Sequence, residues 1–181
     1  MGPGKGYLSR PLAEFRMTLK IRRRSRLRRK ESADLLGRLA DDFGMGVPLE
    51  EVPLDEAEAG PHRLLLRENE AIALFVGEAL APTVRGLIAF PAKKRAVTVD
   101  MGAVRFLYNG ADVMAPGIVD ADPAIRPGDI VWVRDEKNQR PLSVGRAILD
   151  GATMARDEKG KAVETIHYVG DEIWRLGEEA A

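Results

Sequence analysis

The stretch NGADVMAPGI, residues 109–118, has the composition of a binding surface and not of a catalytic centre. It has an Asn-Gly pair at its start and a Pro-Gly pair near its end, and it contains no His, Cys or Ser. A glycine at a bend lets a ligand approach the N–H and C=O groups of the main chain closely. The stretch therefore predicts a site that presents backbone groups to its ligand.

The basic run KIRRRSRLRRK, residues 20–30, is a second candidate site. The whole chain has 28 Lys and Arg residues against 28 Asp and Glu residues, so this run is a local excess of positive charge. A dense cationic block is typical of nucleic-acid contact, because each neutralised phosphate releases counterions. Two alternatives to nucleic-acid contact remain. The run is either a solvated arm or an ion-paired face against the acids in which residues 32–60 are rich.

Side chains that support catalysis are scattered along the chain. There is no cysteine, which excludes disulfides, thiolate metal sites and a cysteine nucleophile. His62 and His167 are isolated in the sequence, and we recognise neither a Walker-type glycine loop nor a nucleophile–base set. We therefore expect a non-catalytic protein that needs no cofactor and no metal.

Length and composition describe an ordinary globular protein. The chain has 181 residues, of which 45% are hydrophobic and 31% charged, enough for one large or two small domains with a stable core. No apolar run approaches the roughly 20 residues of a membrane span, and the N-terminus has no apolar signal core. We therefore expect a cytoplasmic protein without membrane contact.

The first half predicts one α+β domain, residues 15–92, after a flexible N-terminus, residues 1–14. Alternating apolar and basic residues predict a half-buried strand over residues 15–21. An amphipathic helix should follow, with Ser32 as its N-cap and Gly44 at its C-terminal end.

The remainder of this domain predicts a hairpin and a short helix. Residues 62–76 indicate two strands that turn near Asn69. Pro82 should open the short helix. The side chains of this helix that we expect to face inward are Val84, Leu87 and Ile88.

Lys93 and Lys94 mark the start of a second domain, residues 93–176, before a short tail, residues 177–181. Short strands at regular spacing predict a small β-barrel in this domain. Its stretch DIVWVR is apolar on both faces, as in a barrel wall that is buried against its neighbours. The end of the domain, from residue 162, predicts one or two closing strands.

A helix predicted over residues 102–109 positions the candidate site of the second domain. The side chains that we expect to face the core are Val104, Leu107 and Tyr108. Arg105 and Asn109 are four residues apart, so they should share an exposed face of this helix. Gly110 then predicts a left-handed C-cap, which a residue with a Cβ would resist.

These stretches carry a resemblance to a known family. VDMGAVRFLYNGADVMAPGI, followed by RPGDIVWV, LSVGRAIL and ETIHYVGDEIW, resembles the PUA domain in this order over residues 94–176. The first half ends in APTVRGLIAFP, which leads into the PUA domain. This half is similar to the pre-PUA domain of the malignant-T-cell-amplified-sequence family, which includes the N-terminal region of ligatin and archaeal stand-alone PUA proteins. The resemblance implies an α+β fold with an N-terminal α/β pre-PUA domain and a C-terminal PUA β-barrel.

The resemblance also implies an RNA-facing surface on the helix, the Gly-Ala turn, the next strand and the last strand of the PUA domain. Pro116 and Gly117 shape the end of this surface. His167 and Tyr168 on the last strand either stack a base or pack in the core. With the basic positions, the candidate RNA-binding residues are Arg22, Arg23, Arg24, Arg26, Arg28, Lys93, Lys94, Arg105, Asn109, Gly110, Ala111, Met114, His167 and Tyr168.

The function that the resemblance implies is a non-catalytic translation or ribosome-associated factor that contacts RNA, either a tRNA acceptor end or rRNA. Its expected partners are the small ribosomal subunit and an initiation-factor-like protein, and the chain itself is expected to be a monomer. Two alternatives are an accessory protein of RNA modification and a protein–protein adaptor without RNA contact.

The stretch GRLADDFG is similar to the Gly-Arg-Leu-Asp signature of some pseudouridine synthases. However, Ala40 follows Leu39, and the stretch lies on the predicted amphipathic helix, where Leu39 is an ordinary packing residue.

Overall fold

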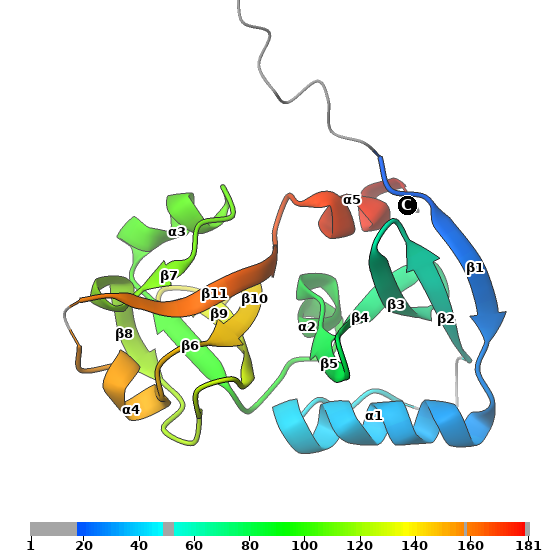
Figure 1. Ribbon diagram of the computed structural model, residues 1–181, viewed down its shortest axis with the longest axis horizontal. Coiled ribbons are helices and arrows are strands. Elements are labelled where there is room, and N and C mark those ends of the chain that lie inside the picture. The colour runs from blue at the N-terminus through cyan, green and yellow to red at the C-terminus, as the bar shows by residue number, and fades with distance from the viewer. Residues whose placement is uncertain (1–17, 49–52, 158, 180–181) are drawn as a thin grey trace, which may run out of the picture.

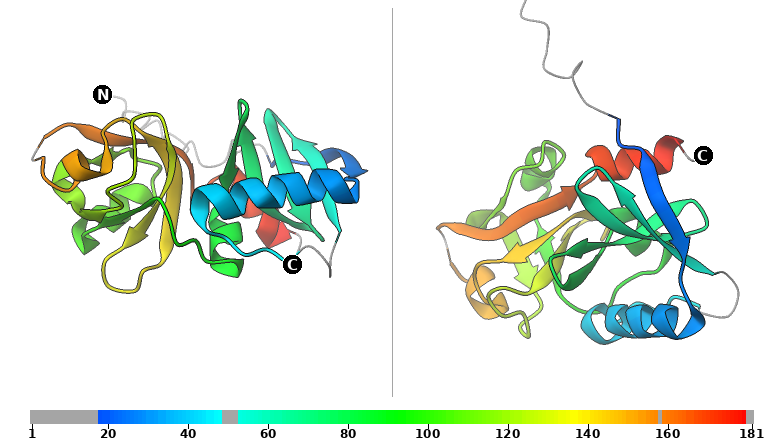
Figure 2. Two further views of the ribbon diagram at one scale, coloured as in Figure 1. Left: turned by 90° about the horizontal axis from the view of Figure 1, so that it is seen from below. Right: turned by 45° about the vertical axis from the view of Figure 1, so that its right-hand side comes forward.

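The first half of the chain is built around a five-stranded antiparallel sheet with the strand order β1-β2-β3-β4-β5 (Figure 1). The computed structural model describes residues 18–48, 53–157 and 159–179. In the views of Figures 1 and 2, this sheet lies between helix α1 and the C-terminal helix α5. The elements of this half are β1 (Ile21–Arg26), α1 (Arg29–Phe43), β2 (Leu54–Ala59), β3 (His62–Arg67), β4 (Glu70–Val76), β5 (Ala79–Pro82) and α2 (Val84–Ala89).

The second half forms a six-stranded sheet with the order β7-β11-β10-β9-β6-β8, which curls into a nearly closed barrel (Figure 1). Its pairs are antiparallel except for β6 and β9, which run parallel. The predicted α+β class with a C-terminal β-barrel is therefore confirmed. The elements of this half are β6 (Ala96–Val99), α3 (Met101–Leu107), β7 (Val113–Met114), the 3-10 turn η2 (Ala115–Gly117), β8 (Ile118–Ala121), β9 (Ile130–Asp135), β10 (Pro141–Ala147), α4 (Gly151–Met154), β11 (Lys161–Tyr168) and α5 (Glu172–Glu179).

Helix α1 begins earlier than its sequence predicts. Its N-cap is Arg28, whose backbone N–H donates to the Glu31 carboxylate at 2.9 Å in a capping box. Ser32, the predicted N-cap, is instead buried inside the helix. The other end is as predicted, because Gly44 ends the helix in the left-handed conformation with φ of 66°.

The first described strand also differs from its prediction. The strand expected over residues 15–21 lies mostly outside the described residues, and residues 18–20 are not a strand. Instead, β1 is formed by the basic run, which pairs with β2 in an antiparallel register that breaks between Arg22 and Ser25. This register sets arginines opposite carboxylates, with Arg22 across from Glu58 and Arg26 across from Asp55, so cross-strand charge pairs favour the strand.

Strand β9 joins the cores of the two halves, as its two apolar faces predict. Val131 and Val133 lie inside the barrel. Ile130 and Trp132, on the opposite face, pack into the core of the first half. Val144 on the neighbouring β10 lies in the same core as Trp132. The barrel wall is therefore buried on both sides, and one continuous apolar layer joins the two halves.

The C-terminal segment also differs from its prediction. Only residues 161–168 form a closing strand, and residues 172–179 form α5. The Asp171 side chain accepts a hydrogen bond from the Trp174 N–H at 2.8 Å, which is the geometry of a helix N-cap. Ile173 and Leu176 have helical spacing and are buried in the core of the first half. The chain therefore returns from the barrel to cover the sheet where it began.

A buried imidazole connects the three segments that meet at this return. The side chain of His167 is fully buried, and its Nε2 accepts a hydrogen bond from the Val84 N–H at 3.0 Å. The proton of the neutral ring must then be on Nδ1, which lies 2.8 Å from Asp171 Oδ2. Strand β11, helix α2 and helix α5 are thus held by one hydrogen-bonded chain of three groups.

Burial opposes the ionisation of Asp171, but the hydrogen bond from His167 and those from the backbone N–H groups of Trp174 and Tyr168 outweigh it. Together they lower the pKa of Asp171 below its ordinary value of 3.8. A carboxyl group whose pKa is lowered by folding stabilises the folded state above its ordinary pKa. That stabilisation is lost as the pH falls through the lower, folded-state pKa.

The turn after α3 depends on a glycine. Gly110 has a φ of +80°, as its sequence predicts, and the ring of Tyr168 lies against it. A Cβ at this position would lie 2.7 Å from two ring atoms of Tyr168, too close for any side chain. Both the left-handed backbone and the close approach of Tyr168 therefore require glycine here.

We predict that Asp171→Asn destabilises the protein by about 1–3 kcal/mol at neutral pH, because the amide cannot accept all three hydrogen bonds of the carboxylate. Asp150→Asn is the matched control, since Asp150 is the N-cap of α4, accepts the Thr153 N–H, and asparagine is an equally good N-cap. Denaturant unfolding between about pH 3 and pH 7 measures the difference. The difference in the free energy of unfolding between wild type and Asp171→Asn should become smaller as the pH falls below 3.8. A difference that does not change with pH would contradict this role of the carboxylate.

We also predict that Gly110→Ala costs more stability than Gly128→Ala. Gly128 has a φ of +92° but no atom within 4 Å of its would-be Cβ, so its substitution measures the backbone cost alone, about 1–2 kcal/mol. Gly110→Ala should cost about another 1–3 kcal/mol because the Cβ overlaps the Tyr168 ring. Thermal unfolding of the two variants is the measurement, and equal losses would show that Tyr168 can move away without cost.

Candidate nucleic-acid interface

Helix α3 presents polar and aromatic side chains to solvent. The helix starts at Asp100, whose carboxylate accepts the Ala103 N–H at 2.9 Å, and it buries Leu107. This orientation leaves Arg105 and Asn109 exposed, as predicted. The Asn109 amide donates to the Arg105 carbonyl oxygen at 3.2 Å, and the Arg105 guanidinium lies 4.7 Å from the centre of the Phe106 ring.

The exposed aromatic and apolar residues around this helix are more numerous than the sequence predicts. Tyr108, expected in the core, is 42% exposed, and Phe106 is 52% exposed. Met114 on β7, one of the predicted contact residues, is 50% exposed. A short helix can bury only a narrow stripe, and Leu107 is its one fully buried side chain. We use the name α3 face for five exposed residues together with the half-buried Gly110 and Ala111 of the turn between them. The exposed residues are Arg105, Phe106, Tyr108, Asn109 and Met114.

The strands next to the α3 face hold its turn in place. The Ala111 carbonyl oxygen accepts the Thr165 hydroxyl at 2.9 Å. Asp112 accepts the Thr165 N–H at 2.8 Å and pairs with the Lys161 ammonium at 2.8 Å. The hydrogen bond from Lys161, followed by that from Thr165, lowers the pKa of Asp112. The turn is thus bonded to β11 at both residues that follow Gly110.

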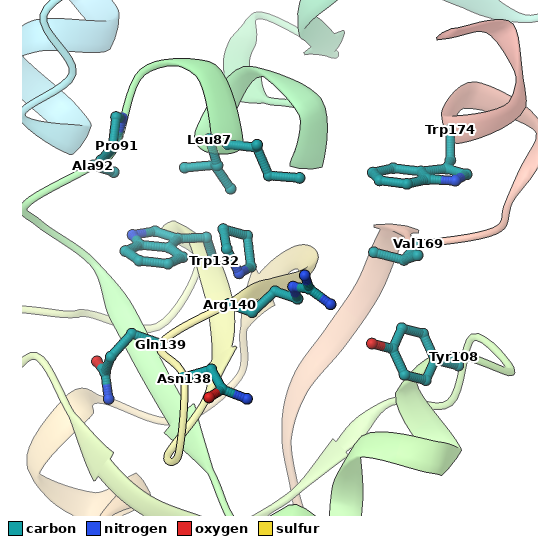
Figure 3. Close-up of a pocket in the computed structure, with 12 residues that line it drawn as sticks. Leu87, Pro91, Ala92, Tyr108, Trp132, Asn138, Gln139, Arg140, Val169 and Trp174 are labelled. Carbon is teal, nitrogen blue, oxygen red and sulfur yellow. The ribbon is translucent and has the colours of Figure 1, made fainter. Parts of the chain in front are cut away.

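A groove that the sequence does not predict opens where the two halves meet (Figure 3). It has a volume of about 850 Å³ and contains side chains from α2, from the end of α3, from the loop between β9 and β10, and from α5. Ile88, expected to face inward from α2, is 53% exposed and lines this groove. Trp132 also lines it and donates its indole N–H to the Lys94 carbonyl oxygen at 2.8 Å.

Strand β1 uses part of the basic run for ion pairs. Arg24 and Arg26 both donate to Asp55, whose side chain is almost fully buried, with Arg24 Nε 2.6 Å from Oδ2. Burial opposes ionisation of Asp55, but the hydrogen bonds from Arg26 and Arg24 outweigh it and lower the pKa of this carboxyl. For these two arginines, the ion-paired alternative is therefore correct.

The other arginines of the run keep their charges at the surface. Arg23 pairs with Glu58 at 3.3 Å, but its side chain is 80% exposed. Arg22 and Arg28 are exposed as well, and neither has a side-chain ion pair with any carboxylate of the described chain. In the views of Figures 1 and 2, β1 lies at the opposite end of the molecule from α3. The two predicted parts of the RNA-binding surface are therefore not contiguous.

Three other predicted contact residues have structural roles. His167 is fully buried in the junction of the two halves, so its ring cannot stack on a base, and the prediction that it packs in the core is correct. The Tyr168 ring packs against Gly110. Lys94 donates from its ammonium to the Asp41 carbonyl oxygen at 3.0 Å, while the Lys93 side chain is exposed.

The part of the chain that the structure describes contains no group of three or more His, Asp or Glu side chains placed to hold a metal ion. Among the same residues, no helix is long and apolar enough to cross a membrane. The chemistry that the α3 face and the groove offer is hydrogen bonding, stacking and contact with negative charge.

The second half of the chain matches the PUA domain family over residues 95–169. The chain is 47% identical over 113 residues to an uncharacterized protein of Methanocaldococcus jannaschii, a match that covers 62% of this chain and 70% of that protein. It is 33% identical to a solved structure of a hypothetical protein of Pyrococcus horikoshii, with a TM-score of 0.72 over 84% of this chain and 98% of that one. A conserved PUA domain protein of Thermoplasma acidophilum has 29% identity and a TM-score of 0.73, over 84% of this chain and 97% of that one.

Eukaryotic proteins also match, over shorter stretches. Translation machinery-associated protein 20 of Eremothecium gossypii is 32% identical over 105 residues, 55% of this chain and 58% of that protein. The malignant T-cell-amplified sequence 1 homolog of Drosophila melanogaster is 34% identical over 97 residues, 52% of this chain and 53% of that protein. The chain thus spans little more than half the length of these relatives.

The archaeal matches include nearly the whole of the P. horikoshii and T. acidophilum chains, so the likeness extends across both halves of the fold. The family match ends at Val169, before α5. On the identity and coverage shared with the M. jannaschii protein, the chain belongs to the family of archaeal PUA-domain proteins that is related to the malignant-T-cell-amplified-sequence and translation machinery-associated protein 20 proteins.

Proposed function

We propose that this protein is a non-catalytic RNA-binding factor of translation that contacts RNA through the α3 face. The observation that carries the proposal is the exposure of Arg105, Phe106, Tyr108 and Asn109 around a glycine turn of a PUA domain. The names of relatives such as translation machinery-associated protein 20 support translation as the process in which the protein acts.

The chemistry of the α3 face suits unpaired nucleotides better than a duplex. Planar side chains such as Phe106 and Tyr108 stack on bases only where the bases are unstacked from one another. Helix α3 has seven residues, too short to follow a groove of a duplex. Arg105 provides a cation for a phosphate, and the Asn109 amide provides both a donor and an acceptor.

The RNA class that fits these features is a single-stranded 3′ end, such as the acceptor end of tRNA, or an unpaired segment of rRNA. In this scheme, the exposed arginines of β1 contact phosphates of the helical part of the same RNA at the far end of the molecule. The small ribosomal subunit and an initiation-factor-like protein are the partners that the proposal implies, and the site of action is the cytoplasm. The chain acts as a monomer in this scheme.

We predict that the protein binds tRNA with an affinity that falls steeply between low and moderate salt, as phosphate contacts require. Arg105→Ala should weaken binding roughly tenfold, about 1.4 kcal/mol, and lower the slope of log affinity against log salt by about 0.7–0.9. The matched control is Arg156→Ala, because Arg156 is an exposed arginine of the same domain beside α4, away from α3 (Figure 1). Fluorescence anisotropy measures both variants.

Removing the unpaired 3′ nucleotides from the tRNA should also weaken binding, and the loss should be smaller for Arg105→Ala than for wild type. Equal effects of Arg105→Ala and Arg156→Ala would contradict the assignment of the α3 face. Capture from extract of a protein partner that survives ribonuclease, without any RNA affinity, would instead support the adaptor alternative.

The arginines of β1 should separate into binding and structural residues. Arg22→Gln combined with Arg23→Gln should lower RNA affinity without changing the melting temperature, since exposed charges contribute little to stability. Arg24→Gln should cost about 1–3 kcal/mol of stability because it removes one partner of the buried Asp55. Anisotropy and thermal unfolding on the same samples test both statements. If the double variant binds RNA as wild type does, β1 is not part of the RNA surface.

A further inference from the structure

The groove between the two halves is continuous with the α3 face. Tyr108 belongs to both, because it lies at the end of α3 and also lines the groove (Figure 3). An RNA strand that leaves the α3 face past Tyr108 therefore arrives directly at the groove. The groove volume of about 850 Å³ lies within the range of sites for small organic ligands, and a nucleotide is a ligand of this size.

Two aromatic side chains, Trp174 and Tyr108, line the groove with surface that a ligand can reach. The Arg85 guanidinium lies 3.9 Å from the centre of the Trp174 ring and so covers one face of this indole. Because Trp174 also lines the groove, its uncovered surface is the part that a ligand can reach. Figure 3 shows Trp174 and Tyr108 on either side of Val169. The indole of Trp132 lies across the groove but is only 4% exposed, so Trp174 and Tyr108 are the rings that a base can reach. Such surfaces are suited to stacking of a base, whatever its identity.

The polar residues of the groove favour an anionic ligand with hydrogen-bonding groups. Arg140 is exposed, and its side chain makes no hydrogen bond or ion pair with the rest of the described chain. In Figure 3 its guanidinium extends into the space between Trp132 and Tyr108. The amides of Asn138 and Gln139 lie in the same loop, and no carboxylate is among the described residues that line the groove.

We propose that this groove binds the terminal unpaired nucleotide of the RNA, with its base against the aromatic residues and its phosphate at Arg140. This inference rests on the proposed function and adds a second binding site to it. A nucleotide uses the aromatic surfaces, the amides and the arginine together. An apolar peptide would leave Arg140 without a partner and would bury the two amides unpaired, which is costly.

The test uses the full chain and a hairpin RNA with an unpaired 3′ overhang. In one RNA the last nucleotide carries 2-aminopurine, and in the second it is abasic. Stacking against Trp174 or Tyr108 should quench the 2-aminopurine fluorescence on binding. The abasic RNA should bind about fivefold to a hundredfold more weakly, which is the contribution of one stacked base.

The groove variant is Ile88→Glu, which places a negative charge on the groove wall at a side chain that is 53% exposed and hence safe for folding. Its matched control is Ile148→Glu, since Ile148 is 41% exposed and does not line the groove. Ile88→Glu should remove the quenching and bring the affinities of the two RNAs together. Arg140→Ala should weaken binding of both RNAs, because the abasic RNA retains its terminal phosphate.

Failure of this inference differs from failure of the proposed function. If the abasic RNA binds as tightly as the 2-aminopurine RNA, or if Ile88→Glu behaves like Ile148→Glu, the groove does not hold the terminal base. The proposed function still stands in that case provided that Arg105→Ala weakens binding of the abasic RNA. RNA binding that is independent of Arg105 would overturn both.

Discussion

The two hydrogen bonds of the buried His167 ring connect the two halves of the molecule. Its Nε2 accepts the N–H at the start of α2, and its Nδ1 donates to the residue that caps α5. Because the ring is fully buried, neither bond can be replaced by water without opening the interface. Helix α5, and with it Trp174, is therefore held against α2 and beside the barrel.

The linker strengthens this arrangement on the other side of the junction. The N–H groups of Lys93 and Lys94 both donate to the carbonyl oxygen of Phe43 at the end of α1, and Arg95 lies near Asp42 and Asp129, from different halves, at 3.7 and 3.9 Å. With Ile130 and Trp132 packed into the first core, the halves have no free hinge at the linker. The groove is thus a property of the joined halves, and its shape is set before any ligand arrives. A preorganised site loses less entropy on binding than a flexible one.

Much of this fold can be predicted from residue types and their spacing along the chain. The groove cannot, because it depends on contacts between segments that are far apart in the sequence. Gly110 is predictable because a left-handed backbone favours glycine, and β9 because both of its faces are apolar. The pairing of Arg24 and Arg26 with Asp55 depends on a strand register that composition does not determine. The apolar spacing of their helices predicts Tyr108 and Ile88 in the core, but both are exposed. A short helix does not reveal from its sequence which of its apolar side chains other elements cover. The groove combines four segments far apart in sequence, so only the tertiary fold brings Tyr108, Arg140 and Trp174 together.

The central claim is that the α3 face of the PUA domain binds unpaired RNA. Titration of isotope-labelled protein with a short single-stranded RNA, followed by backbone amide NMR, maps the contact surface residue by residue. The account predicts that the largest shifts fall on Arg105–Ala111 and on Met114, while the amides of α4 stay unchanged. Shifts confined to β1 and α1, with none around Gly110, would contradict it.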